Sequence, residues 1–212
     1  MLYKISQFIA RGLFRLYFRV RIEGKENIPK EGGYIIVANH ISFLDPLLIC
    51  TIVPRIIHYL TYAIYYYARP LHWFCKRVYC IPIKKDGKDI SGLKKALRLL
   101  KSGELIGIFP EGERSQTGQL QQPEPGVALI ALRAKVPILP VGIRGAYEAF
   151  PRGAKFPKPQ QITITFGKPF RIDDHIDVQR KAQNSDVQQH VLDLIMSRIA
   201  DVCSATYPKA IA

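Results

Sequence analysis

The chain has 212 residues, 48% of them hydrophobic, which is enough for one domain with a sizeable core. The excess of 31 lysines and arginines over 17 acidic residues gives a formal net charge of +14, which favours an anionic partner such as nucleic acid, anionic lipid head groups or phosphorylated substrates. The four cysteines lack CxxC spacing and the five histidines form no paired-ligand pattern, so we expect reduced cysteines in a cytosolic protein and no metal or other bound cofactor.

Residues 1–20 are predicted to form an amphipathic helix. An apolar stripe recurs at helical spacing, and arginines recur every four residues on another face. Such a basic, aromatic-rich helix can lie in the plane of an anionic bilayer, which makes it a candidate membrane-surface anchor. The alternative is a helix that packs its stripe on the domain and leaves its arginines in solvent. The stripe consists of Leu2, Ile5, Ile9, Leu13, Leu16 and Val20.

Strands and helices alternate along the rest of the chain. Strands are predicted at 19–23, 34–38, 56–63, 79–84, 105–109, 137–143 and 161–166, and helices at 46–53, 70–77, 91–102, 126–134 and 185–203. No apolar run reaches the ~18 residues of a membrane span, and we recognise no signal peptide. The alternation predicts a single α/β domain over residues 21–212, with a mostly parallel or mixed sheet of about seven strands flanked by helices.

The segment NHISFLD at 39–45 is the most informative part of the chain. It follows the apolar strand 34–38 and sets His40 five residues before Asp45. A histidine at a strand end can act as a general base if a carboxylate fixes its tautomer and orientation. The sequence Asp45-Pro46 also predicts a helix start, with Asp45 as the N-cap and Pro46 at the first helical position.

A second polar loop, FPEGERS at 109–115, follows the strand 105–109 in the same way. Lys84 and Lys85 follow another strand. In an open α/β sheet, loops beyond the carboxyl ends of the strands gather into one crevice, so these groups would suit transfer chemistry on a phosphate-bearing substrate. The alternatives without a functional role are a tight turn at Pro110 to Gly112 and lysines that are merely solvated. A basic loop at 152–158 is either membrane-facing or an ordinary surface loop.

Four segments together resemble the 1-acylglycerol-3-phosphate acyltransferase (glycerolipid acyltransferase) family. NHISFLD matches the NHxxxxD motif of that family, and FPEGERS matches its FPEGTRS motif. IPIKK at 81–85 is similar to its IPVDR motif, and VPILPV at 136–141 to its VPIxPV motif. The four occur in family order, and the resemblance covers about residues 20–170.

The resemblance implies an enzyme of phospholipid biosynthesis on the cytoplasmic side of a membrane. His40 would take the proton of the acceptor hydroxyl, and Asp45 would orient His40. The hydroxyl would attack the thioester of acyl-CoA or acyl-carrier protein directly, without an acyl-enzyme, and lysophosphatidic acid would become phosphatidic acid. Glu111 and Gly112 would shape the acceptor site. Lys85 and Arg114 would bind the acceptor phosphate, and strand 136–141 would support the site.

Two departures from the family motifs leave the acceptor open. Glu113 stands where FPEGTRS has threonine, and Lys84-Lys85 stand where IPVDR has aspartate and arginine. A lysine keeps the charge but loses the bidentate fork of arginine. Glycerol-3-phosphate or another lyso-lipid is therefore an alternative acceptor. A non-enzymatic module that binds anionic lipid is a further alternative. A nucleic-acid partner is not expected, because the chain carries no RNP-type, helix-turn-helix or zinc-finger pattern.

Overall fold

The computed structural model describes residues 2–69, 71–84, 90–175, 185–205 and 207, and in this part of the chain seven strands form one mixed sheet. The spatial order of the strands is β1-β7-β6-β2-β5-β3-β4, and every neighbouring pair is parallel except β6 with β7. The predicted sheet is thereby confirmed. The strands are β1 (Arg19–Glu23), β2 (Tyr34–Ala38), β3 (Ile57–Tyr62), β4 (Ile81–Ile83), β5 (Leu105–Ile108), β6 (Ile138–Arg144) and β7 (Gln161–Phe166).

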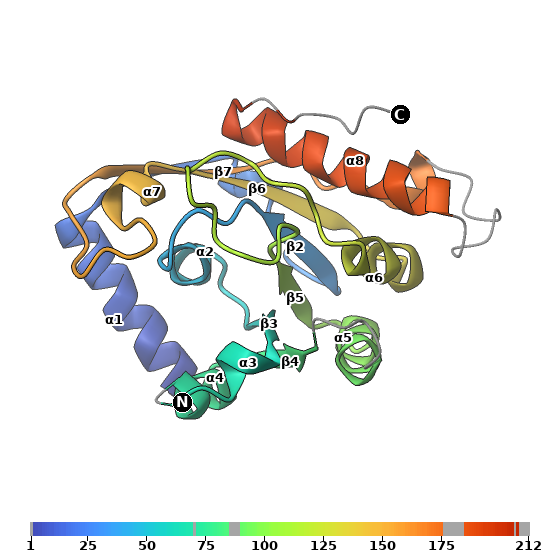
Figure 1. Ribbon diagram of the computed structural model, residues 1–212, viewed down its shortest axis with the longest axis horizontal. Helices are drawn as coiled ribbons and strands as arrows, with labels where there is room; N and C mark the ends of the chain where they lie inside the picture. The colour runs from blue at the N-terminus through green and yellow to red at the C-terminus, as the bar shows by residue number, and fades with distance from the viewer. Residues whose placement is uncertain (1, 70, 85–89, 176–184, 206, 208–212) are drawn as a thin grey trace.

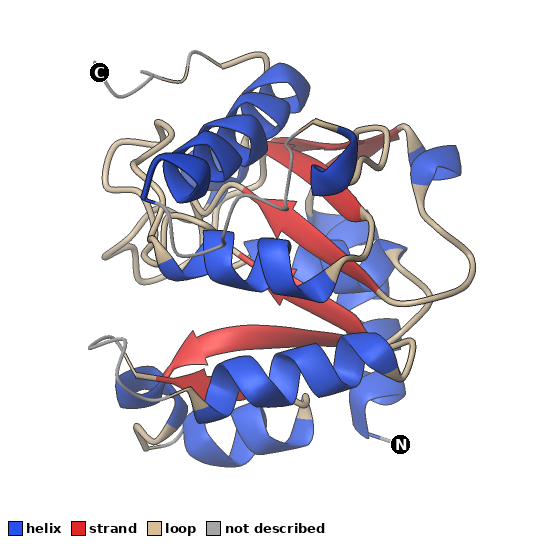
Figure 2. Ribbon diagram, turned by 90° about the vertical axis from the view of Figure 1, so that its right-hand side faces the viewer, coloured by secondary structure: helices blue, strands red, loops and turns tan. Residues whose placement is uncertain are grey.

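Helices cover both faces of the sheet, which gives three layers (Figures 1 and 2). On one face lie α5 (Ser91–Lys101), α6 (Gly126–Ala134) and α8 (Ser185–Cys203); on the other lie α1 (Leu2–Tyr17), α2 (Asp45–Ile52) and α7 (Ala146–Ala149). Two short helices, α3 (Ala63–Tyr66) and α4 (Leu71–Arg77), follow β3 near the β4 edge, and 3₁₀ turns occur at Lys25–Asn27 and Ile172–Asp174. A sheet covered on both faces explains why its strands are continuous apolar runs.

The central strand β2 shows how the sequence makes two cores. All five of its residues are buried. Because successive side chains of a strand point to opposite faces, Ile35 and Val37 pack into the cluster under α5, α6 and α8. Tyr34, Ile36 and Ala38 pack into the cluster under α1 and α2. The strand therefore cannot slip by one residue without exchanging its two buried faces, and the position of the loop after Ala38 is fixed.

Most predicted elements agree with the structure to within two residues, and α6, α8, β1, β2 and β7 have the predicted bounds. One small difference is at the end of β3. The apolar pattern extends the strand to residue 63, but the chain turns into α3 there. The four-residue helices α3 and α7 were not predicted, because a single helical turn is too short to create a periodic pattern.

Helix α1 ends at Tyr17, earlier than predicted, and uses its two sides differently. Phe14, with Phe18 just beyond the helix end, is buried in the core, while Gln7 and Arg11 donate hydrogen bonds to backbone carbonyls at the end of α2. The opposite side is apolar and exposed at Ile5, Phe8, Ile9 and Leu16, with exposures up to 89%. The alternative of a stripe packed on the domain with all arginines in solvent does not describe this helix, since Ile5, Ile9 and Leu16 of the stripe are exposed and Arg11 is bonded to the domain. The role of residues 1–20 as a surface anchor stays a prediction. Among the described residues, no helix has both the length and the apolar character needed to cross a bilayer.

Candidate active site

The predicted site lies at the carboxyl ends of three parallel neighbours, β6, β2 and β5. His40 comes two residues after β2 and Glu111 three residues after β5. The β2–β5 register pairs Val37 with Ile108, so the two loops leave the sheet at the same level. The fold thus brings the loops 39–45 and 109–115 together, as the sequence predicted.

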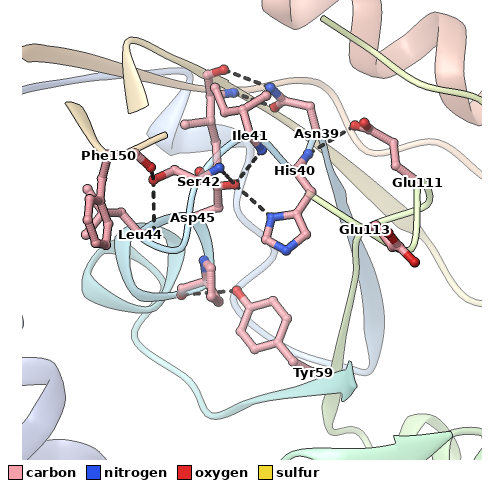
Figure 3. Close-up of polar contacts among 12 residues, drawn as sticks. Asn39, His40, Ile41, Ser42, Leu44, Asp45, Tyr59, Glu111, Glu113 and Phe150 are labelled. Atoms are coloured by element: carbon pink, nitrogen blue, oxygen red, sulfur yellow. Dashed lines mark hydrogen bonds and ion pairs between the residues drawn. The ribbon is translucent and has the colours of Figure 1, made fainter. Parts of the chain in front are cut away.

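His40 and Asp45 form a hydrogen-bonded pair in the turn after β2. His40 Nδ1 lies 2.8 Å from Asp45 Oδ2, and the same oxygen accepts the N–H groups of Ile41 and Ser42 at 2.7 Å each (Figure 3). The Asp45 side chain is fully buried, whereas the imidazole is 18% exposed. Burial raises the pKa of Asp45, and its bonds to His40 and to the two backbone N–H groups oppose that shift. The carboxylate is therefore rigidly placed, and the ring nitrogen Nε2 points away from it.

The predicted capping role of Asp45 is wrong, although the helix start is right. Asp45 is the first residue of α2, Leu44 is the N-cap, and no side chain caps the helix end. The carboxylate turns back towards the loop instead, where its Oδ2 accepts three donors while its buried Oδ1 has no partner among the described residues. The Asp45 carboxylate does not cap α2, because it is directed at the imidazole and at the N–H groups of the turn instead.

Glu111 supports the backbone of His40. Its Oε1 accepts the His40 N–H at 3.0 Å, and its Oε2 accepts the backbone N–H and the side-chain amide of Gln121 at 3.2 Å each. The Ser115 N–H in turn donates to the His40 carbonyl at 2.7 Å. Burial raises the pKa of Glu111 to about 7, and its hydrogen bonds oppose the shift. The loop 109–121 therefore holds the histidine from the side opposite Asp45.

A stack of three rings fixes the face of the imidazole. The His40 ring lies 4.1 Å from the Phe109 ring at 19°, and Phe109 stacks on Tyr59 at 5.6 Å and 8°. Gly107 makes room for this stack, because a Cβ at that position would lie 2.4 Å from the Tyr59 ring. The His40 side chain is therefore held at Nδ1, at its backbone and across one face of its ring.

Comparisons with known proteins identify the family of the chain. A family model described as Acyltransferase matches residues 19–144, more than half of the chain. The chain belongs to this family. The acyltransferase is 27% identical over 182 residues to the 1-acyl-sn-glycerol-3-phosphate acyltransferase of Bacillus subtilis, covering 85% of this chain and 88% of that protein. It is 26% identical to the chloroplastic enzyme of that name, LPAT1, from Arabidopsis thaliana, over 66% of this chain and 40% of that protein. The resemblance found in the four motifs is confirmed.

The fold of the acyltransferase is that of a solved structure. The 1-acyl-sn-glycerophosphate (LPA) acyltransferase PlsC from Thermotoga maritima superimposes with a TM-score of 0.74 at 24% sequence identity. The match covers 98% of this chain and 81% of that chain. At this identity the likeness establishes the three-layer α/β architecture.

The other predicted site residues of the acyltransferase lie on the same loop. Gly112 adopts a positive φ of 72°, and a Cβ there would lie 2.7 Å from the Tyr62 hydroxyl, so the turn requires glycine. The Arg114 guanidinium lies over the Phe43 ring, 5.8 Å from its centroid, which places it beside the turn 39–45. Lys85 lies outside the described residues. The roles assigned to these residues and to Glu111 in acceptor binding stay predictions.

The contacts of two polar residues beside His40, Asn39 and Ser42, were missed by the sequence analysis. The Asn39 side-chain amide exchanges two 2.8 Å hydrogen bonds with the backbone of Ile143, which joins the ends of β2 and β6. Ser42 Oγ donates to the Phe150 carbonyl at 2.8 Å, and both polar side chains are buried. The sequence offered one signal, namely polar residues directly after an apolar strand. Buried polar groups are almost always hydrogen-bonded, so such residues can be expected to have partners. Their partners, more than 100 positions away, leave no local trace.

Proposed function

We propose that the acyltransferase transfers a fatty acyl group from an acyl thioester to the sn-2 hydroxyl of 1-acylglycerol-3-phosphate, giving phosphatidic acid. The donor is acyl-CoA or acyl-carrier protein, used as a co-substrate. The observation that carries the chemistry is the 2.8 Å bond between His40 and a buried, backbone-fixed Asp45. The acceptor is suggested by the names of the relatives from Bacillus subtilis and Arabidopsis thaliana.

The proposed mechanism needs one base. Asp45 accepts the Nδ1 proton of neutral His40, so Nε2 carries the lone pair. Nε2 removes the proton of the acceptor hydroxyl as its oxygen attacks the thioester carbonyl. The tetrahedral intermediate then collapses, the C–S bond breaks, and the thiolate leaves with the proton that His40 had taken. The products are one ester and one thiol, so no other reactant is required.

Direct transfer fits the serines of the two motif loops. Ser42 and Ser115 are both 0% exposed. The Ser42 hydroxyl donates to the Phe150 carbonyl, and the Ser115 hydroxyl accepts the Thr117 N–H at 3.3 Å. Hydroxyl groups that are buried and hydrogen-bonded are poorly placed to attack a thioester, which supports direct transfer to the acceptor without an acyl-enzyme.

The acceptor is recognised in this proposal through its phosphate, by Arg114 and Lys85. One observation keeps glycerol-3-phosphate or another lyso-lipid as the second candidate. Glu113 places a carboxylate on the loop that carries Glu111, 3.9 Å from Arg152. We refer to Glu113, Arg114 and Arg152 as the rim of the site. A carboxylate beside the phosphate position changes which head groups fit.

Membrane attachment on the cytoplasmic side is part of the same proposal, with residues 1–20 as the surface anchor. The exposed apolar side of α1, notably Phe8 and Leu16, suits an interfacial helix, and the net charge of +14 suits anionic lipid. Tyr67 and Trp73, near the α3–α4 edge of the sheet, are exposed by 61% and 56%. Such aromatic side chains are favoured at the bilayer interface.

The test of the anchor is a double variant, Phe8→Ser with Leu16→Ser, in co-sedimentation with vesicles that contain anionic lipid. Both side chains are exposed, by 78% and 89%, so the fold should be unaffected. Vesicle affinity should fall by at least about tenfold, because the apolar area that would enter the bilayer is lost. The matched control is Ile22→Ser on β1, 42% exposed. Equal binding by the double variant and the control would contradict the anchor.

The test of the chemistry is phosphatidic acid formation from an acyl thioester and lysophosphatidic acid, with intact protein and His40→Ala compared by mass spectrometry of the lipid. The turnover number should fall roughly 10²- to 10⁴-fold, the usual contribution of a general base. Undiminished turnover in His40→Ala would overturn the role of His40. Transfer to a different lyso-lipid only would keep the mechanism and change the acceptor. Anionic-lipid binding without thioester turnover on any acceptor would favour the non-enzymatic module.

A further inference from the structure

The segment between β6 and β7 is fastened to the active site. It begins at Gly145 with a φ of 82° and continues as α7. The Phe150 carbonyl accepts the Ser42 hydroxyl of the catalytic turn at 2.8 Å, as Figure 3 shows. The Tyr147 hydroxyl donates to the Gln116 carbonyl at 2.7 Å, on the loop that carries Glu111 and Glu113. A segment outside the four motifs is therefore tied to both motif loops.

Arg152 reaches the rim of the site from this segment. It comes two residues after Phe150, and its Nη1 lies 3.9 Å from Glu113 Oε2. The side chains are 44% and 40% exposed, so the pair contributes little to folding. Glu113 itself lies two residues beyond Glu111, which holds the backbone of His40. The ion pair thus belongs to the loop that supports His40, Glu113 is drawn in the same close-up as the imidazole (Figure 3), and folding stability does not explain the pair.

We propose that Arg152 binds the phosphate of the acyl acceptor and that Glu113 is the residue that positions it. This rests on the proposed function, since it assigns a further residue to the same acceptor site. A guanidinium has five N–H donors in a plane and can bridge a carboxylate and a phosphate at once. Arg152 also neutralises the carboxylate that replaces the uncharged threonine of the family motif, so the rim keeps its attraction for a phosphate monoester.

Arg152 would act together with Arg114. Arg114 follows Glu113 directly in the chain, and its guanidinium lies over the Phe43 ring, within the catalytic turn. Arg152 comes from a different loop. Two guanidinium groups delivered from separate loops can contact a phosphate from different directions, which discriminates it from a neutral head group more sharply than one cation.

The experiment measures acyl transfer to a short-chain 1-acylglycerol-3-phosphate below its critical micelle concentration, so that membrane binding has no influence. Arg152→Ala should raise the acceptor KM about tenfold through loss of a charge-assisted contact, while kcat and the donor KM stay within about twofold. The matched control is Lys155→Ala, which removes the same charge from an exposed position of the same loop. An acceptor KM equal in the two variants would overturn the proposal.

A phosphate-free acceptor separates this inference from the proposed function. The ratio of kcat/KM for the phosphate acceptor to that for a monoacylglycerol should fall about tenfold in Arg152→Ala and stay unchanged in Lys155→Ala. If Arg152→Ala slows both acceptors equally, phosphate recognition by Arg152 is wrong while acyl transfer stands. If the intact protein transfers to no phosphate acceptor at all, the proposed function fails and this inference fails with it.

Substitutions of Glu113 test the positioning role. Glu113→Thr should raise the acceptor KM about threefold in the intact protein and have no effect in the Arg152→Ala background, because a residue that acts through Arg152 is not additive with its loss. Arg152→Lys should recover part of the lost affinity by restoring charge without the fork. A lower acceptor KM in Glu113→Thr would mean that the carboxylate repels the acceptor and would overturn the positioning role.

Discussion

The catalytic turn and the rim of the site are held in different ways. In the turn 39–45, a buried carboxylate accepts an imidazole and two backbone N–H groups at 2.7–2.8 Å. At the rim, Glu113 and Arg152 meet at 3.9 Å through side chains that are about 40% exposed. In the turn, Asp45 is held by backbone N–H groups directly after strand β2. At the rim, two long and partly exposed side chains meet each other.

This difference suits the two tasks. A base must be oriented to within a fraction of an ångström, so its supports are short and buried. Recognition of a head group tolerates small shifts of the binding side chains. Exposed charged side chains can provide such recognition with little effect on the free energy of unfolding. Changes in the turn should therefore act on kcat, and changes at the rim on the acceptor KM.

The largest effect is expected from Asp45→Asn in the turn. An amide at this position cannot stabilise the imidazolium and favours the wrong tautomer of His40, so kcat should fall by about 10³- to 10⁴-fold. Steady-state kinetics with a thermal unfolding control would measure it. If kcat falls by less than about tenfold, as expected for a rim residue, the proposed distinction between turn and rim does not hold.

The pH dependence of stability tests whether Glu111 belongs with the buried turn. Its pKa in the folded protein is about 7, above the ordinary 4.5, so between these values the unfolded chain releases a proton that the folded protein keeps. The free energy of unfolding should fall by about 3 kcal/mol as the pH rises through this window. Above the window, Glu111 should cause no further change. Urea unfolding from pH 4 to 8 should show this slope in the intact protein and not in Glu111→Gln. Equal slopes would mean that Glu111 is solvated like a rim carboxylate.

Gly107→Ala tests the ring stack that supports the turn. The new Cβ would lie 2.4 Å from the Tyr59 ring, and the stacked Phe109 and His40 rings would have to move. We expect a loss of about 1–3 kcal/mol in the free energy of unfolding, as for other overpacked cores, and a lower kcat at temperatures where the variant is folded. Chemical denaturation followed by kinetics would check both. A destabilised variant with the normal kcat would show that the stack supports the fold and not the base.

The smallest effect is expected at the rim, from Arg114→Lys. Lysine keeps the charge but loses the planar fork and the contact with Phe43, so the acceptor KM should rise roughly three- to fivefold with kcat unchanged. Initial rates over a range of acceptor concentrations would measure this. A larger effect on kcat than on KM would place Arg114 with the catalytic turn.

The sequence predicted much of this molecule because its signals are local. The run 34–38, with polar residues directly after it, predicted β2 and the position of His40, and the alternation of elements predicted the sheet. The bonds of Asp45 were predicted in part, since its link to His40 is local but its loss of the capping role depends on the turn geometry. The contact of Arg152 was not predicted, because it joins two loops 39 positions apart and no local pattern marks it.

Helix α2 connects the N-terminal helix α1 to Asp45. Gln7 and Arg11 of α1 donate to the last carbonyls of α2, at Cys50, Thr51 and Val53, while the first residue of α2 is Asp45. The eight-residue helix α2 is about 12 Å long, so it spans the distance from the side chains of α1 at its C-terminal end to Asp45 at its N-terminal end. A tilt of α1 on a lipid surface would be transmitted mechanically to the carboxylate that orients the base. Hydrogen bonds at the two ends of α2 thus join the proposed membrane anchor to the proposed base.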